Sequence, residues 1–538
     1  MSMTPSTRLE YLAKRQNLIQ EDRARRVDRN AVYRSSPDEL RADELIRRIR
    51  KDEGESIWGK QQLHGSEQLF PGMEFLTSRE KIVGTKVYDI LSHMPKGGLL
   101  HLHLGMVVQV DKVLRMGLKY PAMHVRTSAL LTADNLTTVL PIFRALPQDK
   151  WTTHASLTDP LYVPDSWVPI QRARKNFSEA LGGPEGFDRW VTDWMVINPS
   201  EAYGTHNSPD KIWSKFYATS MVSQGLIFFL PLWEEYVREV FLSSLEDGIS
   251  YTEPRYMFGE KFMIGADGKK NVPHHEWLRV YDRVIASVKS TLRDPSVFLG
   301  SKLIYSVVRN LSLEDMEWHL DNCLALKRDF PHLIAGFDLV GHEDSLKPLI
   351  YYAEPFLKFL EKQKELGVHV PFVFHAGETL GDGSAADMNL YDAILLGTKR
   401  IGHGFSLIKH PRLMELCKEQ KICVEVCPIS NEILRYCGSM PMHPLPALMN
   451  QGVHVALCSD DPAVFGNMGL SFDFFQIFVA SDIHGLGTLR ELVWDSIRYS
   501  GLDEDEKGHA FAMLEGQWNT FVKFILDKYG KDSARGQP

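Results

Sequence analysis

The sequence predicts an α/β fold in which eight parallel strands close into a barrel with helices outside, a (β/α)8 TIM barrel. Short apolar runs alternate with helical stretches from about residue 90 onward, which is typical of βα units and a parallel sheet. Eight such runs occur, and eight parallel strands joined by helices close a barrel. No glycine-rich phosphate fingerprint follows any run, which disfavours the alternative of an open doubly wound sheet.

The eight predicted strands are short, apolar and separated by stretches of helical pattern. The chain has 538 residues, of which 44% are hydrophobic, so it is long enough for one large barrel with additions. In chain order the strands are Gly98–Leu104, Ile249–Tyr256, Phe298–Val308, Leu333–Val340, Val368–Phe374, Arg400–His403, Ile422–Cys427 and His454–Ser459.

Two segments lie outside this βα pattern. Residues 1–90 are polar, charge-rich and helical in pattern, and they form either a solvated arm or an arm for homodimerisation. Residues 91–530 hold the barrel. Within them, residues from about 120 to 215 are rich in Pro, Trp and Gly and have no clean period, so we interpret them as a long insertion after the first strand.

Composition restricts the partners and the compartment. The net charge of −8 argues against nucleic acid, which usually needs a basic surface. The apolar stretch Met221–Trp233 is too short to span a bilayer, and no secretory signal opens the chain. Three of the six cysteines, Cys423, Cys427 and Cys458, lie in predicted core strands, which favours buried free thiols. We therefore expect a cytoplasmic protein with a small-molecule partner and no membrane association.

Histidines stand where two predicted strands end, and barrel active sites lie at the C-terminal ends of the strands. The first run ends with His101 and His103, which point to the same face because they are two residues apart in a strand. Two imidazoles on one face suit a borderline cation such as zinc. The fifth run is followed by His375, with Glu378 three residues later. A lone His-x-His is a weak signal, and the second strand end strengthens it.

Two further strand ends carry polar residues. His403 lies between two glycines, which leave it unobstructed. Asp460 and Asp461 follow the eighth run, and adjacent side chains point in different directions, so one can bind a metal while the other faces a substrate. A turn-forming Asp-Asp-Pro is the plain alternative. Coincidence across four strand ends of one barrel is much less probable than any single accident.

Taken together, these motifs resemble the adenosine/AMP deaminase superfamily, over about residues 90 to 500. Two stretches, Gly336–Glu343 and Glu425–Asn431, look like the adenosine deaminase-related growth factor branch, as does the opening Met94–Gly98. Members of that branch carry a helical N-terminal dimer arm and an insertion after the first strand. The motifs that carry the wider resemblance are Met94–His103, His375–Glu378, Gly402–Gly404 and Ser459–Pro462.

The resemblance implies a role for each matching position. Glu378 matches the proton donor to purine N1, and His403 matches the residue that orients the attacking water. Asp461 matches the partner of N7, and Gly341 matches the backbone donor to N3. The implied ligands of one Zn²⁺ per chain are His101, His103, His375 and Asp460.

The reaction implied is hydrolytic removal of the 6-amino group of an adenine nucleoside or nucleotide, which yields the inosine form and ammonia. Attack at C6 builds charge on N1, which a protonated Glu378 can relieve if burial raises its pKa. A catalytically silent growth-factor or binding protein is the alternative, disfavoured by the complete ligand set. A binuclear amidohydrolase is a second alternative, and the end of the fourth run lacks the bridging lysine that such a site usually needs.

One position departs from the family pattern. The family normally has an Asp or Glu just after the second histidine, where it contacts the ribose, whereas Leu104 and Gly105 stand here. The loss removes an acceptor for a sugar hydroxyl and a charge that would repel a 5′-phosphate by about 4 kcal/mol at ~4 Å. We hypothesise that AMP, ADP or ATP is accepted. Basic residues that could bind the phosphate, or be ordinary surface charges, are Arg172, Arg174, Lys175, Lys211, Lys215 and Arg255.

Other candidate substrate contacts remain open. Glu253 and Arg255, near the end of the second run, are either an ion pair or substrate contacts. A group of aromatic residues could form a lid that stacks on the base, although ordinary packing explains most such residues. This group comprises Trp190, Trp194, Trp213 and Phe216, of which Trp213 is the predicted substrate contact.

Overall fold

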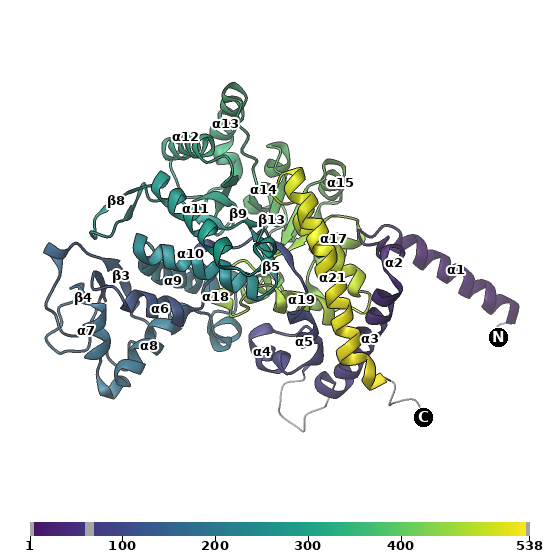
Figure 1. Cartoon of the computed structure of the whole chain (residues 1–538), viewed down its shortest axis with the longest axis horizontal. Coiled ribbons are helices and arrows are strands. Elements are labelled where there is room, and N and C mark those ends of the chain that lie inside the picture. The colour runs from purple at the N-terminus through teal and green to yellow at the C-terminus, as the bar shows by residue number, and fades with distance from the viewer. Residues whose placement is uncertain (1–4, 60–68, 534–538) are drawn as a thin grey trace.

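The barrel strands pair in parallel all the way round, so the predicted fold class is confirmed. The computed structural model describes residues 5–59 and 69–533 (Figure 1). The ten segments that build the barrel are β1 (Gly97–Leu99), β5 (Ile249–Thr252), β6 (Arg255–Met257), β9 (Gly300–Ser301), β10 (Leu303–Val308), β11 (Ile334–Val340), β12 (His375–Ala376), β13 (Arg400–His403), β14 (Cys423–Val426) and β15 (Val455–Leu457).

The pairings form a closed circuit. β5 lies between β1 and β9, β10 lies between β6 and β11, and β12 to β15 follow in order. Parallel bridges join the remaining neighbours, Phe337 to Phe372 between the fourth and fifth runs and Leu102 to Asp460 between the first and eighth. The second predicted strand is interrupted at Pro254, which has no N–H to donate to a ladder. All eight predicted runs therefore take part in the barrel.

Helices follow the strands and cover the barrel from outside. They are α10 (Leu230–Glu246), α11 (His274–Thr291), α12 (Leu313–Asp329), α13 (Ala353–Leu366), α14 (Ala385–Leu395), α15 (Pro411–Gln420), α17 (Leu445–Asn450) and α20 (Leu486–Arg498). Local capping residues define the helix ends. Ser312, for example, precedes α12, and its hydroxyl accepts a hydrogen bond from the Asp315 N–H. Shorter helices α16 (Pro428–Ile433), α18 (Pro462–Phe465) and α19 (Ser471–Val479) follow the last two strands.

The predicted insertion forms a subdomain at one side of the barrel (left in Figure 1). It contains an antiparallel sheet of β2 (Met123–Arg126), β3 (Ile142–Ala145) and β4 (Val168–Pro169), with helices α6 (Val110–Leu118), α7 (Ile170–Lys175), α8 (Gly183–Asp193) and α9 (Pro209–Ile227). Helix α9 packs closely on β3, since a Cβ added at Gly225 would lie 2.9 Å from the Phe143 carbonyl oxygen. A hairpin of β7 (Phe262–Ile264) and β8 (Lys270–Pro273) lies on the same side.

The N-terminal segment is helical, with α1 (Pro5–Arg23), α2 (Ala31–Arg34), α3 (Pro37–Glu53), α4 (Phe75–Val83) and α5 (Lys86–Ser92). Only α1 projects from the body (Figure 1). Helix α3 packs on the C-terminal helix α21 (Glu504–Ser533), where the Trp518 indole donates to Glu39. Residues 1–4 and 60–68 of the predicted arm lie outside the described residues. Homodimerisation through the arm stays a prediction.

The cysteines and the helices bear on two expectations that were drawn from composition. All six cysteines are buried and unpaired, as predicted. Among the residues that the structure describes, no helix combines the length and the apolar character needed to cross a bilayer.

Candidate active site

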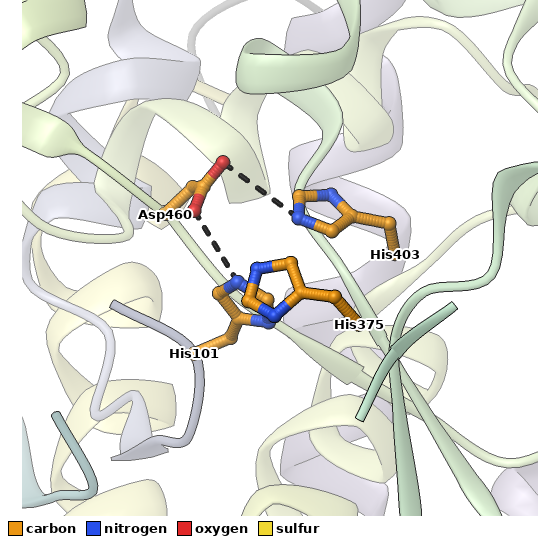
Figure 2. A group of neighbouring side chains, drawn as sticks. All are labelled: His101, His375, His403 and Asp460. Atoms are coloured by element: carbon orange, nitrogen blue, oxygen red, sulfur yellow. Dashed lines mark ion pairs between the residues drawn. The ribbon is translucent and has the colours of Figure 1, made fainter. Parts of the chain in front are cut away.

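Four buried side chains from four strand ends of the barrel rim converge on one point (Figure 2). The ligand atoms of His101, His375, His403 and Asp460 all lie within 4.8 Å of one another. His103 joins the cluster through Asp460, whose Oδ1 is 3.2 Å from its Nε2. His403 and Asp460 have φ of 60° and 61°, a left-handed conformation that costs about 1–3 kcal/mol and is concentrated at functional sites.

Carboxylates behind the cluster orient two of the histidines. The Glu425 Oε2 is 2.9 Å from His101 Nδ1, and the Asp338 Oδ2 is 2.6 Å from His375 Nδ1. Burial alone would raise both carboxyl pKa values. Arg255 and Arg400 nevertheless hold the pKa of Glu425 below the usual range, and His375 and Arg255 do the same for Asp338. An ionised carboxylate only accepts hydrogen bonds, so each Nδ1 carries the proton and each Nε2 presents a bare lone pair to the cluster.

This arrangement fits a bound cation. His101 Nε2 lies 3.3 Å from Asp460 Oδ1, and among the described residues neither atom has a hydrogen-bond partner. Two acceptors that face each other repel unless a positive ion lies between them. A tetrahedral zinc site with bonds of about 2.0–2.1 Å places its ligands about 3.4 Å apart, close to this separation. The other oxygen of Asp460 accepts from the Ser430 hydroxyl at 2.7 Å, which leaves Oδ1 for the metal.

A chain of hydrogen bonds gives His403 the opposite tautomer. The Leu445 N–H donates to His443 Nδ1 at 3.1 Å, so the neutral His443 carries its proton on Nε2. That Nε2 donates to the side-chain amide oxygen of Asn431, Oδ1, at 3.1 Å. The Asn431 amide nitrogen, 3.3 Å from His403 Nδ1, must then be the donor. His403 therefore holds its proton on Nε2, which favours a role in orienting water over metal binding.

Replacing Asn431 by Asp tests this tautomer. A carboxylate can only accept, so it would draw the proton of His403 to Nδ1 and leave Nε2 without one. We expect kcat to fall about 10²–10⁴-fold, the range for a catalytic histidine in the wrong tautomer, while bound metal is retained. Asn322→Asp is the matched control, because Asn322 also donates to a histidine, His274, outside the site. Equal kcat values for the Asn431 variant and wild type would contradict the assignment.

A cavity of about 630 Å³ opens from the cluster, a volume within the range for small-molecule sites. Its inner end is lined by His103, His375, Glu378, His403, Asp460 and Asp461, and its walls include Trp213, Phe216, Tyr217, Val308, Leu311 and Gly341. Gly341 adopts φ of 106°, and a Cβ there would lie 2.9 Å from Leu346. The backbone at this position therefore depends on glycine.

Two buried acidic side chains of the cavity, Glu378 and Asp461, are suited to hold protons. Burial raises the pKa of Glu378 well above its usual value, and the charges of Asp460 and Glu343 raise it further. The Oε1 of Glu378 is 3.5 Å from His403 Nδ1. Burial, together with Asp460, also raises the pKa of Asp461. The raised pKa of each group favours its protonated form, which can donate a hydrogen bond.

Several predicted substrate contacts lie at the cavity, and others do not. Trp213 lines it and stacks on the ring of His342 at 4.8 Å, and Phe216 lines it as well. Trp190 packs instead against Phe177 and Phe187 within the insertion. Trp194 donates its indole N–H to the Leu136 carbonyl. The lid hypothesis therefore applies only to Trp213 and Phe216.

The position of Glu253 corrects the prediction that it contacts the substrate. It does not line the cavity, and its carboxylate is fully buried, where it pairs with Arg400 at 2.6 Å and accepts from the Tyr251 hydroxyl. Arg255 pairs with Asp338 and Glu425 at 2.6 Å each. Both residues serve a buried ionic network beneath the metal cluster. A substrate contact for Glu253 is therefore inconsistent with its position.

The predicted phosphate-binding residues of the insertion also lie elsewhere. Arg174 pairs with Asp188 and Lys215 with Glu201. Arg172, Lys175 and Lys211 likewise do not line the cavity. The basic residues that do line it, besides Arg255, are Arg144 and Lys270, which the sequence analysis missed. No local motif marks either residue, because they come from β3 and β8 and meet only in the folded chain.

The chain is similar to known deaminases over most of its length. The sequence model of the family described as adenosine deaminase matches residues 233–514. Adenosine deaminase 2-A of Danio rerio is 32% identical over 458 residues, 85% of each chain. Adenosine deaminase 2 of Homo sapiens is 32% identical over 465 residues, 85% of this chain and 84% of the relative.

Among solved structures, the apo N6-methyl-AMP deaminase from Arabidopsis thaliana aligns with a TM-score of 0.53 at 16% identity. The alignment covers 80% of this chain and 98% of that one. Arabidopsis ADAL complexed with GMP also aligns with a TM-score of 0.53, at 17% identity, over 80% of this chain and 98% of that one. At these identities the two structures support the fold alone. Together with the sequence relatives and the convergent site, they lead to one conclusion: the chain belongs to the adenosine deaminase family and is a hydrolytic deaminase.

Proposed function

We propose that this protein is a zinc-dependent aminohydrolase that converts an adenine nucleoside or nucleotide to its inosine form. The observation that carries the proposal is the cluster itself: bare histidine nitrogens face the Asp460 carboxylate, beside the buried Glu378, whose pKa is raised, at the inner end of one cavity. His101, His103, His375 and Asp460 would hold the zinc ion. When bound, zinc supplies a water whose pKa is lowered to about 7.

The remaining groups act on the purine. His403, with its proton on Nε2, orients the attacking oxygen toward C6. As the C6–O bond forms, Glu378 transfers its proton to N1 and so removes the charge that builds there. Asp461 donates a hydrogen bond to N7, and the Gly341 N–H donates to N3. The proton of the new C6 hydroxyl then passes to N6, the C6–N6 bond breaks as the 6-oxo group forms, and the amino group leaves as ammonia.

The sugar end of the cavity supports nucleotides as substrates. Leu104 is fully buried and Gly105 lines the cavity, so no carboxylate from this turn faces a 5′-substituent. A 5′-phosphate therefore escapes a repulsion of about 4 kcal/mol at ~4 Å. We propose AMP, ADP and ATP as substrates beside adenosine. We also propose that the protein works in the cytoplasm as a homodimer.

A substrate panel tests this proposal. Zinc is measured in the purified protein, and kcat/KM is determined for adenosine, AMP and ATP from the loss of adenine absorbance. We expect zinc at one per chain and kcat/KM for AMP or ATP at least equal to that for adenosine. Adenosine more than about tenfold better than both nucleotides would contradict nucleotide preference. A protein without zinc that deaminates none of the three would contradict the enzyme itself.

A further inference from the structure

We propose that the outer end of the cavity is a phosphate subsite, in which Arg144 and Lys270 bind the 5′-phosphate oxygens of an adenine nucleotide. The inference rests on the proposed function and names the residues that would recognise its substrate class. Both side chains line the same cavity as Glu378 and Asp460. One comes from the insertion and the other from the β7–β8 hairpin.

A continuous wall leads from the metal cluster to Arg144. Gly105 follows His103 and lines the cavity, and a Cβ there would meet Ile227 of α9 at 3.2 Å. Gly225 of the same helix touches Phe143 on β3, the residue before Arg144. This wall starts at the position where the family carries its ribose-contacting carboxylate. A sugar held near Gly105 would therefore direct its 5′-substituent along α9 toward β3.

The hairpin brings Lys270 to the same end of the cavity. Gly268, in the turn between β7 and β8, packs so tightly on the residues after β3 that a Cβ would lie 2.3 Å from the Leu146 carbonyl carbon and the Pro147 nitrogen. β3 and β8 lie on the same side of the molecule (Figure 1). The insertion and the hairpin thus jointly build the outer wall, and each contributes one cation.

Arg144 is available for an anion. Its side chain is exposed, and within the described ranges it makes no ion pair or side-chain hydrogen bond. The contrast with Arg255, which also lines the cavity, is direct: Arg255 is 1% exposed and already engages two carboxylates. A planar guanidinium binds phosphate through two parallel hydrogen bonds, which makes a free arginine a strong phosphate ligand.

Lys270 can also bind a phosphate, once its ion pair with Glu260 breaks. Its ammonium pairs with Glu260, which also lines the cavity. Both partners of the pair are exposed, at 39% and 59% of their side-chain surface, and such pairs contribute only about 0–1 kcal/mol. A phosphate that carries more charge can replace Glu260. The glutamate keeps the lysine at the cavity edge without a substrate and competes with the phosphate.

The test compares substrate ratios in three cavity variants, Arg144→Ala, Lys270→Ala and Glu260→Gln. The ratio of kcat/KM for AMP or ATP to that for adenosine should fall at least about tenfold in Arg144→Ala, should fall in Lys270→Ala, and should rise in Glu260→Gln. Arg172→Ala, an exposed arginine of the same insertion, and Lys269→Ala, the neighbour of Lys270, are the matched controls and should keep the wild-type ratio. Calorimetric binding of IMP relative to inosine provides a second readout that needs no turnover.

The outcomes separate this inference from the proposed function. Wild type that deaminates nucleotides, with unchanged ratios in Arg144→Ala and Lys270→Ala, would overturn the subsite while the proposed function stands. Wild type that deaminates adenosine alone and binds IMP no better than inosine would overturn both nucleotide use and the subsite. A fall in the nucleotide-to-adenosine ratio in both Arg144→Ala and Lys270→Ala, with no fall in the two control variants, would support the subsite.

Discussion

Glu378→Gln should lower kcat about 10²–10⁴-fold, the contribution of a general acid, with zinc still bound. The amide keeps the size of the side chain but has no proton of suitable acidity for N1. Burial raises the pKa of Glu378 in wild type, which favours the acid form. Wild-type activity should fall as the pH rises through that raised pKa. The variant should lose this alkaline limb from its pH profile of kcat.

Two measurements make this prediction decisive. The zinc content and the affinity for inosine report whether the site is otherwise intact, and both should match wild type. Glu276→Gln, at a partly exposed glutamate on α11 outside the cavity, is the matched control for the chemical change and should keep full activity. A Glu378→Gln variant with wild-type kcat would rule out Glu378 as the proton donor, and with it the mechanism proposed above.

Arg255→Met should weaken zinc binding by about 10–100-fold, the usual effect of losing the groups that orient metal ligands. Arg255 neutralises the two carboxylates that orient His101 and His375. Without it, the buried Asp338 loses its arginine partner, which destabilises a fold by about 3–5 kcal/mol, while Glu425 keeps Arg400. Their pKa values would rise, and protonated carboxyls would no longer fix the histidines with bare Nε2 atoms.

Zinc affinity is measured by competition with a chelator, and stability by thermal unfolding of the zinc-free protein. Arg174→Met serves as the control, because it removes an ion pair with Asp188 that is about one third exposed and therefore contributes little. Unchanged zinc affinity in Arg255→Met would show that the network does not act on the metal site. Glu425→Gln keeps the side-chain volume, removes the carboxylate that orients His101 and should also weaken zinc binding.

The positions of the site residues could be predicted because they depend on local rules. His101 and His103 share a face through the two-residue period of a strand, and parallel strands bring their C-terminal ends to one rim. The structure brings these residues, His375, His403 and Asp460 together as the strand ends required. Asp460 and Asp461 also meet at this rim, where both line the inner end of the cavity.

The partners of the site residues could not be predicted in this way. Glu253 and Arg255 lie near a strand end, which made a substrate contact reasonable. The neighbours that neutralise them, Arg400 and Glu425 among others, come from strands far along the chain. Which charges meet inside a barrel depends on the register between strands, and no local pattern encodes that register.

The sequence alone therefore predicted the fold class, the family resemblance and the polar side chains that meet at the barrel rim, because each follows from short-range periodicity and motif spacing. The tertiary structure decided how those side chains are protonated and what lines the rest of the cavity. The tautomers of His101, His375 and His403 depend on Glu425, Asp338 and Asn431, which approach from other strands and loops. Arg144 and Lys270 become neighbours of one cavity only because the insertion and the hairpin pack together.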